Sequence, residues 1–564
     1  MIIENYMIDK IIDDISISRK NQFWLFFIIL ILLSLCMVLI YGPAYTHPGY
    51  DYYFHLKRFE ALITAFQEGT YPNYIDHAAA LNYGYLSKVF YSDIILLPFA
   101  ALGTIIGSYQ AYEVMLFAMT ILCGLFMYWM TNTIYKSSYV AFIASILYTF
   151  SVYRLFDIYN RGALGEVFAF TFIPLVFLGL YHIVKGDYRK WYIIAIGFSL
   201  LIFSHVISTV LTFITVVIIL LLYCKLLFKE PKRIYFLILA GFVTLLITAV
   251  YIYPLLEQMQ ANSYRYETND WTLPSRAKLP FYHVIWALIC GFFYPKNLSI
   301  VGIGILLTSV IFLRLFVKEK SNMLRSVDIG VLIGLFYILA SSHLFPWGRF
   351  PFTLLSFIQY PTRLYLLVTF FFALAGGYYL SQIFKKEKAR FIVAGIVVLC
   401  SAITLYTHSA HFKDMYVIIS ESNSEPNPSN FFYLNGAEYV PDRMESGYHI
   451  LLRGDTIMSA ENRTKIIEAQ RDKNILKINI ETQGLDSLEL PLLYYKGYSA
   501  ELNAEELPIV QSHQGLIQIP VDKSGNVKVY YKGTIIQKVS YYISILSIFV
   551  LCIYIFCQRK RKTI

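Results

Sequence analysis

Three side chains that could carry out chemistry lie within Thr46–Glu60, THPGYDYYFHLKRFE, the segment directly after the first long apolar stretch. A Pro-Gly pair interrupts the chain there, and Asp51, His55 and Arg58 follow at spacings of four and three residues. A helix that starts at this point carries all three on one face. A carboxylate beside these groups can accept a proton or hold a metal, and the cations can hold a phosphate or pyrophosphate leaving group. Alternatively, Asp51 is a helix N-cap and the other two are interfacial polar residues.

Three further polar clusters lie where apolar stretches end. Asp157, Arg161 and Glu166 occur in YRLFDIYNRGALGE and either shape a site or are ordinary loop charges. His205 follows a serine at a break between two apolar runs, where a lone histidine is more often a hydrogen-bonded cap than a ligand.

The last of these clusters is QYPTR, which begins with Gln359 and ends with Arg363. Arg363 either snorkels to the membrane surface or clamps a lipid phosphate.

The composition excludes a soluble globular protein, because 57% of the 564 residues are hydrophobic and only 15% are charged. We therefore expect a polytopic α-helical membrane protein. The net charge of +10 comes from short Lys and Arg clusters between apolar stretches, which are typical topology signals, so we expect no nucleic-acid partner. All seven cysteines lie in or beside apolar segments, which argues against disulfides and zinc.

The apolar stretches predict about twelve transmembrane helices. The expected spans are 23–41, 112–131, 139–153, 166–184, 191–205, 207–224, 234–256, 298–317, 327–342, 363–384, 390–407 and 540–557. Two further apolar pieces, 89–107 and 281–293, are expected to be re-entrant or interfacial helices, because complete crossings would break the alternation.

The basic clusters fix the expected orientation through the positive-inside rule. Residues 1–22 form a cytoplasmic N-terminus that acts as a signal anchor, and 558–564 form a basic cytoplasmic tail. The transmembrane domain is 23–407, with outer loops 42–111, 154–165, 257–297 and 343–362, and the last helix is 539–557. All four polar clusters then face outward.

Segment 408–538 changes character and predicts a small extracytoplasmic β-rich domain. Leu476, Ile478 and Ile480 alternate with polar residues, and Ile517–Ile519 and Val527–Tyr531 show the same period of two. We expect a β-sandwich that either binds an acceptor or caps the membrane domain. The sequence favours both of these roles over a catalytic role for this domain.

The chain resembles multi-span bacterial proteins of the GT-C glycosyltransferase superfamily, in particular the membrane proteins called 6-pyruvoyl-tetrahydropterin synthase-related. The matching segments are GYDYYFHLKRFEAL, NYGYLSKVFY, SVYRLFDIYNRGALGE, LIFSHVIS, IQYPTR and AEYVP, which occur in this order from about residue 45 to residue 441. The pterin name looks misleading, since the chain has no soluble histidine cluster for zinc.

This resemblance implies sugar transfer from a polyprenyl-phosphate carrier on the outer face of a bacterial cell membrane, to an envelope glycopolymer, glycolipid or protein. It implies that Asp51 is the catalytic carboxylate and that Asp157 is a second functional acid, and we count His55 and Glu166 among the candidate catalytic residues. Arg58, Arg161, His205 and Arg363, together with Gln359, then bind the carrier phosphate. No Asp-X-Asp pair occurs in the first outer loop, so no cofactor is assigned, and a Mg²⁺ or Mn²⁺ ion stays an open alternative.

Two other classes of function stay open. One is a transporter or flippase for a lipid-linked or anionic solute, in which the same cations line a passage. A transporter that is coupled to protons should have acidic residues deep inside its spans, whereas the acidic residues here lie near the ends of the spans. The other is a non-catalytic envelope assembly factor whose β-rich domain does the binding.

The predicted orientation can be tested by labelling. We expect cysteines introduced at Asn73, Asn262 and Ser487 to react with an impermeant maleimide in intact cells, and one at Lys386 to stay unlabelled. The reverse pattern would contradict the orientation.

Overall fold

The chain of this computed structural model divides into two compact units, which are described separately. Unit 1 comprises Met1–Tyr52, Tyr109–Thr244 and Asp270–Ser422, and unit 2 comprises Tyr53–Ser108, Leu245–Asn269 and Asn423–Ile564. The structure describes residues 19–42, 51–268, 273–293, 300–422, 438–444 and 447–563. The predicted Pro-Gly break before Asp51 lies outside the described residues.

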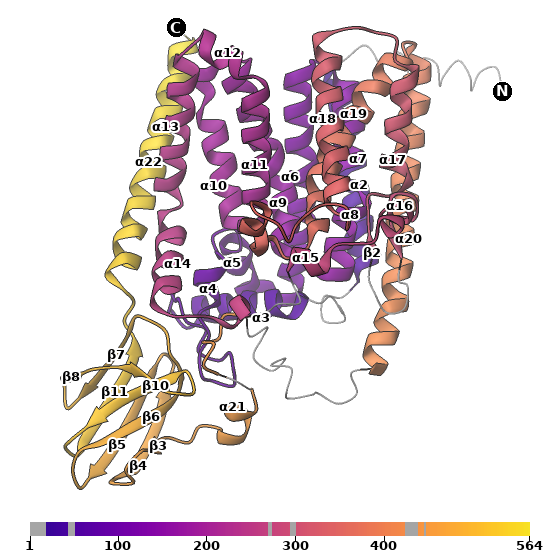
Figure 1. Ribbon diagram of the computed structural model, residues 1–564. Coiled ribbons are helices and arrows are strands. Elements are labelled where there is room, and N and C mark those ends of the chain that lie inside the picture. Colours follow the sequence, from indigo (N-terminus) through magenta and orange to yellow (C-terminus); the bar gives the residue numbers. More distant parts are fainter. Residues whose placement is uncertain are drawn as a thin grey trace. The chain divides into compact units, whose positions relative to one another are not determined.

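Unit 1 is built almost entirely from helices (Figure 1). Its longer helices are α2 (Arg19–Tyr41), α6 (Ser108–Tyr135), α7 (Ser138–Thr149), α9 (Leu164–Val184), α10 (Tyr192–Ser204), α11 (Val206–Leu222), α13 (Lys232–Ile247), α16 (Phe281–Cys290), α17 (Gly304–Leu313), α18 (Asn322–Ala340), α19 (Tyr365–Ile383) and α20 (Glu387–Ser422). Shorter pieces are α8 (Val152–Phe156), α12 (Cys224–Lys229), α15 (Pro274–Ala277) and the hairpin of β1 (Phe292–Phe293) and β2 (Ile300–Val301).

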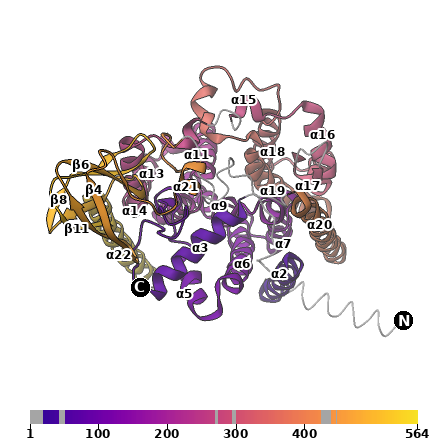
Figure 2. The ribbon, with the colours of Figure 1, turned by 90° about the horizontal axis from the view of Figure 1, so that it is seen from below.

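The centre of unit 1 consists of α7, α9 and α19, and α2 and α20 pack on α7 further out (Figure 2). The candidate spans that contain the three central helices are each 94% buried, whereas those of α2 and α20 are only 28% and 17% buried. Most exposed residues of the outer pair are nevertheless apolar, among them Leu39 and Leu399. Apolar side chains on an outer surface are what a helix in contact with lipid requires.

Glycines allow the central helices to approach closely. A Cβ on Gly179 of α9 would lie 2.3 Å from the backbone nitrogen of Ile194 in α10. A Cβ on Gly377 of α19 would lie 2.7 Å from the carbonyl oxygen of Val140 in α7. Small residues at such contacts are typical of helix packing in membranes, where close van der Waals contact replaces the hydrophobic driving force.

The predicted count of twelve spans is not confirmed. Among the described residues, eight helices are long and apolar enough to cross a membrane, and α13 with α14 (Ala249–Ala261) would make a ninth if this pair, bent by 69°, is one span. The expected spans 191–205, 207–224 and 298–317 contain helices of only 13, 17 and 10 residues. The expected re-entrant pieces contain α5 (Leu97–Ile106) and α16, which are also short.

Unit 2 combines helices with a β-rich region (Figure 1). Its helices are α3 (Tyr52–Gln67), α4 (Ser87–Phe90), α5, α14, α21 (Tyr448–Arg453) and α22 (Ile535–Thr563). Its strands are β3 (Met458–Ser459), β4 (Thr464–Asp472), β5 (Ile475–Thr482), β6 (Asp486–Leu493), β7 (Tyr498–Leu502), β8 (Glu505–Leu507), β9 (Val510–Gln511), β10 (Leu516–Val521) and β11 (Gly525–Tyr531). Helix α20 continues to Ser422, so the described strands begin well after the expected boundary at residue 408.

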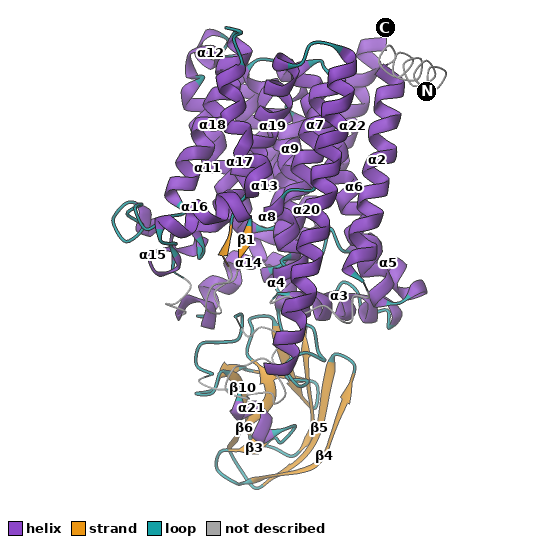
Figure 3. Cartoon of the chain, turned by 90° about the vertical axis from the view of Figure 1, so that its right-hand side faces the viewer, coloured by secondary structure: helices purple, strands orange, loops and turns teal. Residues whose placement is uncertain are grey.

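The strands form two antiparallel sheets, in the orders β3-β6-β10-β9 and β4-β5-β11-β7-β8. Figure 3 labels β3, β6 and β10 of the first sheet and β4 and β5 of the second. The residues that alternate in the sequence supply their common core. In β5, Leu476, Ile478 and Ile480 are at most 5% exposed, while Lys477 and Asn479 between them are exposed. Burial of every second side chain confirms the strands predicted from the period of two.

A second hydrophobic core joins this β-rich region to the segment between α3 and α5. Tyr83, Tyr85 and Phe90 pack with Leu493 and Tyr495 in one buried cluster. The backbone N–H of Leu493 also donates to the carbonyl of Tyr83 at 2.9 Å. The β-rich region and this loop therefore fold together as parts of unit 2.

Candidate active site

The connection between α8 and α9 places two charged residues at the end of a buried span. After α8 the chain forms a π-helix, Asp157–Arg161, which stops at Gly162 with φ of 65° and ψ of 26°. A Cβ on Gly162 would lie 2.7 Å from Cβ of Tyr52 and 2.9 Å from its Cα, so only glycine fits here. Single π-helical turns are frequently found at functional sites, which draws attention to Asp157 and Arg161.

Arg161 contacts three carboxylates. Its Nη1 lies 2.8 Å from Oε1 of Glu166 and 3.3 Å from Oδ1 of Asp157, and its Nη2 lies 3.4 Å from Oδ2 of Asp51. The backbone N–H of Asp51 also donates to the carbonyl of Arg161 at 2.7 Å. This backbone bond holds Asp51 at the turn independently of its side chain.

A second arginine reaches the same cluster from the start of α19. Nε of Arg363 donates to Oε1 of Glu166 at 2.8 Å, and its Nη1 donates to the carbonyl of Ile358 and to Oε1 of Gln359. Gln359 has a positive φ of 66°, a conformation that costs energy for any residue with a side chain. The other carboxylate oxygen of Glu166 accepts a bond from the Tyr153 hydroxyl at 3.0 Å.

Burial separates the three carboxylates. The side chains of Asp157 and Glu166 are 0% and 1% exposed, Arg363 is 7% exposed and Arg161 is 16% exposed, whereas Asp51 is 44% exposed. Asp51 is therefore the carboxylate that a substrate can reach. Among the described residues, no group of three His, Cys, Asp or Glu side chains is arranged to hold a metal ion.

His205 lies between α10 and α11 and is a hydrogen-bonded helix cap, the role that the sequence favoured for a lone histidine. Its Nδ1 accepts from the backbone N–H of Ser208 at 3.3 Å and lies 2.8 Å from the Ser208 hydroxyl oxygen, so it caps α11. Its ring packs against the start of α9, where a Cβ on Gly165 would lie 3.2 Å from Cδ2. His205 therefore borders the cluster through packing and through its electrostatic interaction with Glu166.

His55 and Arg58 belong to unit 2. Both lie on α3 and are buried, and Nε of Arg58 is 3.3 Å from Oδ1 of Asp93. Arg58 also lies over the ring of Tyr91, 5.2 Å from its centroid. Burial raises the pKa of Asp93, although Arg58 and Lys88 act to lower it.

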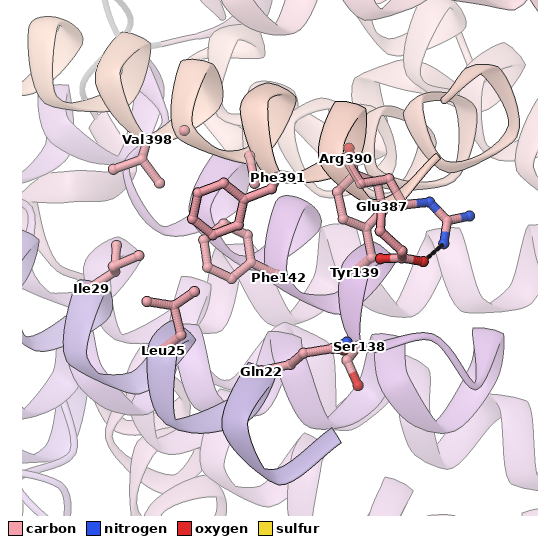
Figure 4. A pocket seen from close by; sticks show the side chains of 12 residues that line it. Gln22, Leu25, Ile29, Ser138, Tyr139, Phe142, Glu387, Arg390, Phe391 and Val398 are labelled. Atoms are coloured by element: carbon pink, nitrogen blue, oxygen red, sulfur yellow. Dashed lines mark hydrogen bonds and ion pairs between the residues drawn. The ribbon is translucent and has the colours of Figure 1, made fainter. Parts of the chain in front are cut away.

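Unit 1 also contains an apolar groove (Figure 4). It has a volume of 190 Å³ and lies between α2, α7 and α20, with Phe142 and Phe391 in its walls and the Glu387–Arg390 ion pair at 3.1 Å. Its lining includes Ser138, the first residue of the span that ends at Arg161. The groove therefore lies toward the opposite end of that span and takes no part in the cluster.

Six of the nine residues singled out from the sequence come together in unit 1, and a seventh borders them. Asp51, Asp157, Arg161, Glu166, Arg363 and Gln359 form the cluster, and His205 borders it. Sequence reasoning missed Tyr153, Lys88 and Asp93. Tyr153 lies in the same motif as Asp157. The signal that could have identified it is its hydroxyl group, because a buried tyrosine hydroxyl usually finds a hydrogen-bond partner.

Comparison with known proteins places this chain among bacterial membrane proteins. Residues 48–424 match the family described as "Bacterial membrane protein YfhO". The chain is also 24% identical over 347 residues to an uncharacterized protein of Lactococcus lactis subsp. cremoris (strain MG1363), a match that covers 58% of this chain and 55% of that protein. The chain thus spans about half the length of this relative. The narrower pterin-synthase-related name does not occur in these descriptions and stays a prediction.

We expect Glu166→Gln to lower the free energy of unfolding by about 3–5 kcal/mol, the range for breaking a buried ion pair. The physical reason is that both arginines lose the charge of their shared buried partner. Denaturation of the purified protein measures the loss. Glu387→Gln is the matched control, because Glu387 is 53% exposed and its one ion-pair partner among the described residues is Arg390, so its loss should cost about 0–1 kcal/mol. Equal, small effects of the two substitutions would show that Glu166 does not stabilise the cluster.

Proposed function

This chain belongs to the YfhO family of bacterial membrane proteins, and from its charged cluster we propose that it is a membrane glycosyltransferase. In this proposal it transfers a sugar from a polyprenyl-phosphate carrier to an envelope polymer, lipid or protein on the outer face of the membrane. The observation that supports it best is that three carboxylates meet at Arg161 and only Asp51 is accessible.

Asp51 is suited to accept a proton from the acceptor hydroxyl. Its backbone is fixed by the bond to Arg161, while its side chain has one long ion pair of 3.4 Å and is 44% exposed. A carboxylate that is held in place and stays accessible can take a proton from a bound substrate. Asp157 is the reserve candidate, since its Oδ2 is buried and has no hydrogen-bond partner among the described residues.

The reaction balances without a further reactant. The acceptor hydroxyl gives its proton to Asp51, and its oxygen bonds to the anomeric carbon of the sugar. The bond between that carbon and the carrier phosphate oxygen breaks, and the phosphate leaves with the electron pair. The negative charge that grows on the phosphate needs a fixed cation nearby.

Arg363 is the best candidate for this cation. Its Nε and Nη1 are occupied by Glu166, Gln359 and a backbone carbonyl, which leaves Nη2 without an acceptor among the described residues. The cluster has three carboxylates and two guanidinium groups, so a phosphate close to Asp51 would be repelled. Asp51 contacts Arg161, Arg161 contacts Glu166, and Glu166 contacts Arg363. Asp51 and Arg363 are thus at opposite ends of this chain of ion pairs, which favours a phosphate on the Arg363 side.

The remaining residues act through these two. Glu166 has both oxygens occupied and is 1% exposed, so we assign it a positioning role for the arginines in place of the catalytic role expected from the resemblance. Gln359 orients Arg363. Within unit 2, His55 stays a proposal for a catalytic residue and Arg58 for substrate binding.

The test of the enzyme is Asp51→Asn, assayed by sugar transfer from a lipid-linked donor. We expect transfer to fall by about 100-fold or more, because asparagine cannot accept the proton. Stability should change by no more than about 1 kcal/mol, since the lost ion pair is partly exposed. Glu387→Gln removes a similarly exposed carboxylate from an arginine and should transfer normally.

Near-normal transfer by Asp51→Asn would remove this residue from the mechanism and move the proposal to Asp157. If the wild-type protein binds the carrier but transfers no sugar, the result favours a transporter.

Carrier binding tests Arg363. Arg363→Lys keeps the positive charge beside Glu166 but removes the free Nη2, so we expect binding of a polyprenyl-phosphate analogue to weaken by about 1.5–3 kcal/mol, the range for a hydrogen bond to a charged group. Arg390→Lys is the matched control, because Arg390 likewise combines one glutamate with backbone carbonyls. Equal weakening in both variants would indicate diffuse attraction to anionic lipid.

A further inference from the structure

Unit 2 contains a cavity of 270 Å³ where residues 72–77 meet the turn at Asn474 and the first two turns of α22. Pockets for drug-sized ligands begin at about 300 Å³, so this cavity suits a single sugar-sized group. Its lining is mostly polar and aromatic and includes Tyr74, His77 and Lys538.

We propose that this cavity binds a phosphate group attached to a sugar or a similar polyol. Tyr74 and Tyr541 line the cavity, and aromatic rings can pack against the apolar face of a sugar ring. Lys532 and Lys538 are exposed, and neither has an ion-pair partner among the described residues, so both can bind a phosphate. The amide of Asn474 can bond to hydroxyl groups.

One wall of the cavity is held by hydrogen bonds before any ligand binds. Nε2 of Gln537 donates to the Tyr531 hydroxyl oxygen at 2.8 Å, and that hydroxyl donates to the carbonyl of Lys496 at 3.1 Å. Oε1 of Gln537 accepts from the backbone N–H of Thr534 at 2.9 Å. A preformed wall reduces the entropy that a ligand must lose on binding.

One buried polar atom adds to the case for a ligand. Nε2 of His77, a residue that lines the cavity, is buried with no hydrogen-bond partner among the described residues. Burial, followed by the charges of Lys88 and Arg471, lowers the pKa of His77 to about 4, so its imidazole is neutral near pH 7. Buried polar atoms are normally satisfied by protein, water or ligand.

An interfacial belt does not account for this cavity. Tyr541 and Lys538 stand at the start of a candidate span, where aromatic and basic residues are common. Tyr74, His77 and Asn474, however, come from two other segments of the chain and line the same cavity. An aromatic belt at the membrane interface would need only residues of α22, and not residues from these two other segments.

The test uses the full chain in phosphatidylcholine nanodiscs, titrated calorimetrically with mannose 6-phosphate, mannose and inorganic phosphate. We expect mannose 6-phosphate to bind at least about tenfold more tightly than either other probe, which corresponds to about 1.4 kcal/mol. Lys532→Gln and Lys538→Gln should each weaken the phosphorylated probe about 3–10-fold and leave mannose unchanged. Tyr74→Ala should weaken both sugars, while Tyr74→Phe should bind normally.

Lys465→Gln is the matched control, because Lys465 is an exposed lysine of β4 outside the cavity. Doping the nanodiscs with phosphatidylinositol identifies the source of the ligand: competition with the soluble probe assigns a lipid headgroup, and its absence assigns a soluble phosphosugar. Absence of binding, equal binding of inorganic phosphate, or equal weakening by Lys465→Gln would each overturn the inference.

The role of this cavity in sugar transfer rests on the proposed function, but ligand binding is measured without transfer. Failure of the binding test leaves an Asp51-dependent transfer activity standing. Conversely, failure of transfer leaves specific binding in the cavity intact.

Discussion

Glu166 bonded to two guanidinium groups is the interaction on which the charged cluster depends. One of its oxygens accepts from both Arg161 and Arg363 at 2.8 Å, and the other accepts from Tyr153. Burying an ionised carboxylate costs several kcal/mol unless cations and hydrogen bonds compensate. The start of α9 is thereby joined to the π-helical turn before it and to the turn that precedes α19. Each arginine then has donors left over, and these determine what else the cluster can bind.

The turn before α9 gives the cluster its shape. The π-helical geometry and the left-handed Gly162 bring Asp157 and Arg161 to the same side, and the bond from Asp51 to the carbonyl of Arg161 attaches the segment before α3. Because Gly162 lies against Tyr52 with no room for a Cβ, the backbone rather than a flexible side chain sets the position of Asp51. Electrostatic stabilisation of a reaction requires such fixed positions, since mobile charges would have to reorganise during the reaction.

Unit 2 contributes a different kind of surface. Its β-rich region shares a buried aromatic core with the loop between α3 and α5, so the two fold together, and the cavity beside α22 is built from both. This arrangement suits recognition of a hydroxylated, anionic group better than catalysis, because the lysines of its lining are exposed. The choice between gripping an acceptor and capping the membrane domain stays a prediction.

The sequence by itself determined the membrane class, the helical character of unit 1 and the strands of the β-rich region, because hydrophobic content and periodicity are local properties. It also identified Asp51, Asp157, Arg161 and Arg363 through their positions at the ends of apolar stretches. The tertiary structure decided which of them meet, since contacts such as that between Arg363 and Glu166 join residues 197 positions apart. It also decided which carboxylate is exposed and how long each helix is, because burial and helix breaks depend on packing between segments that hydropathy treats one at a time.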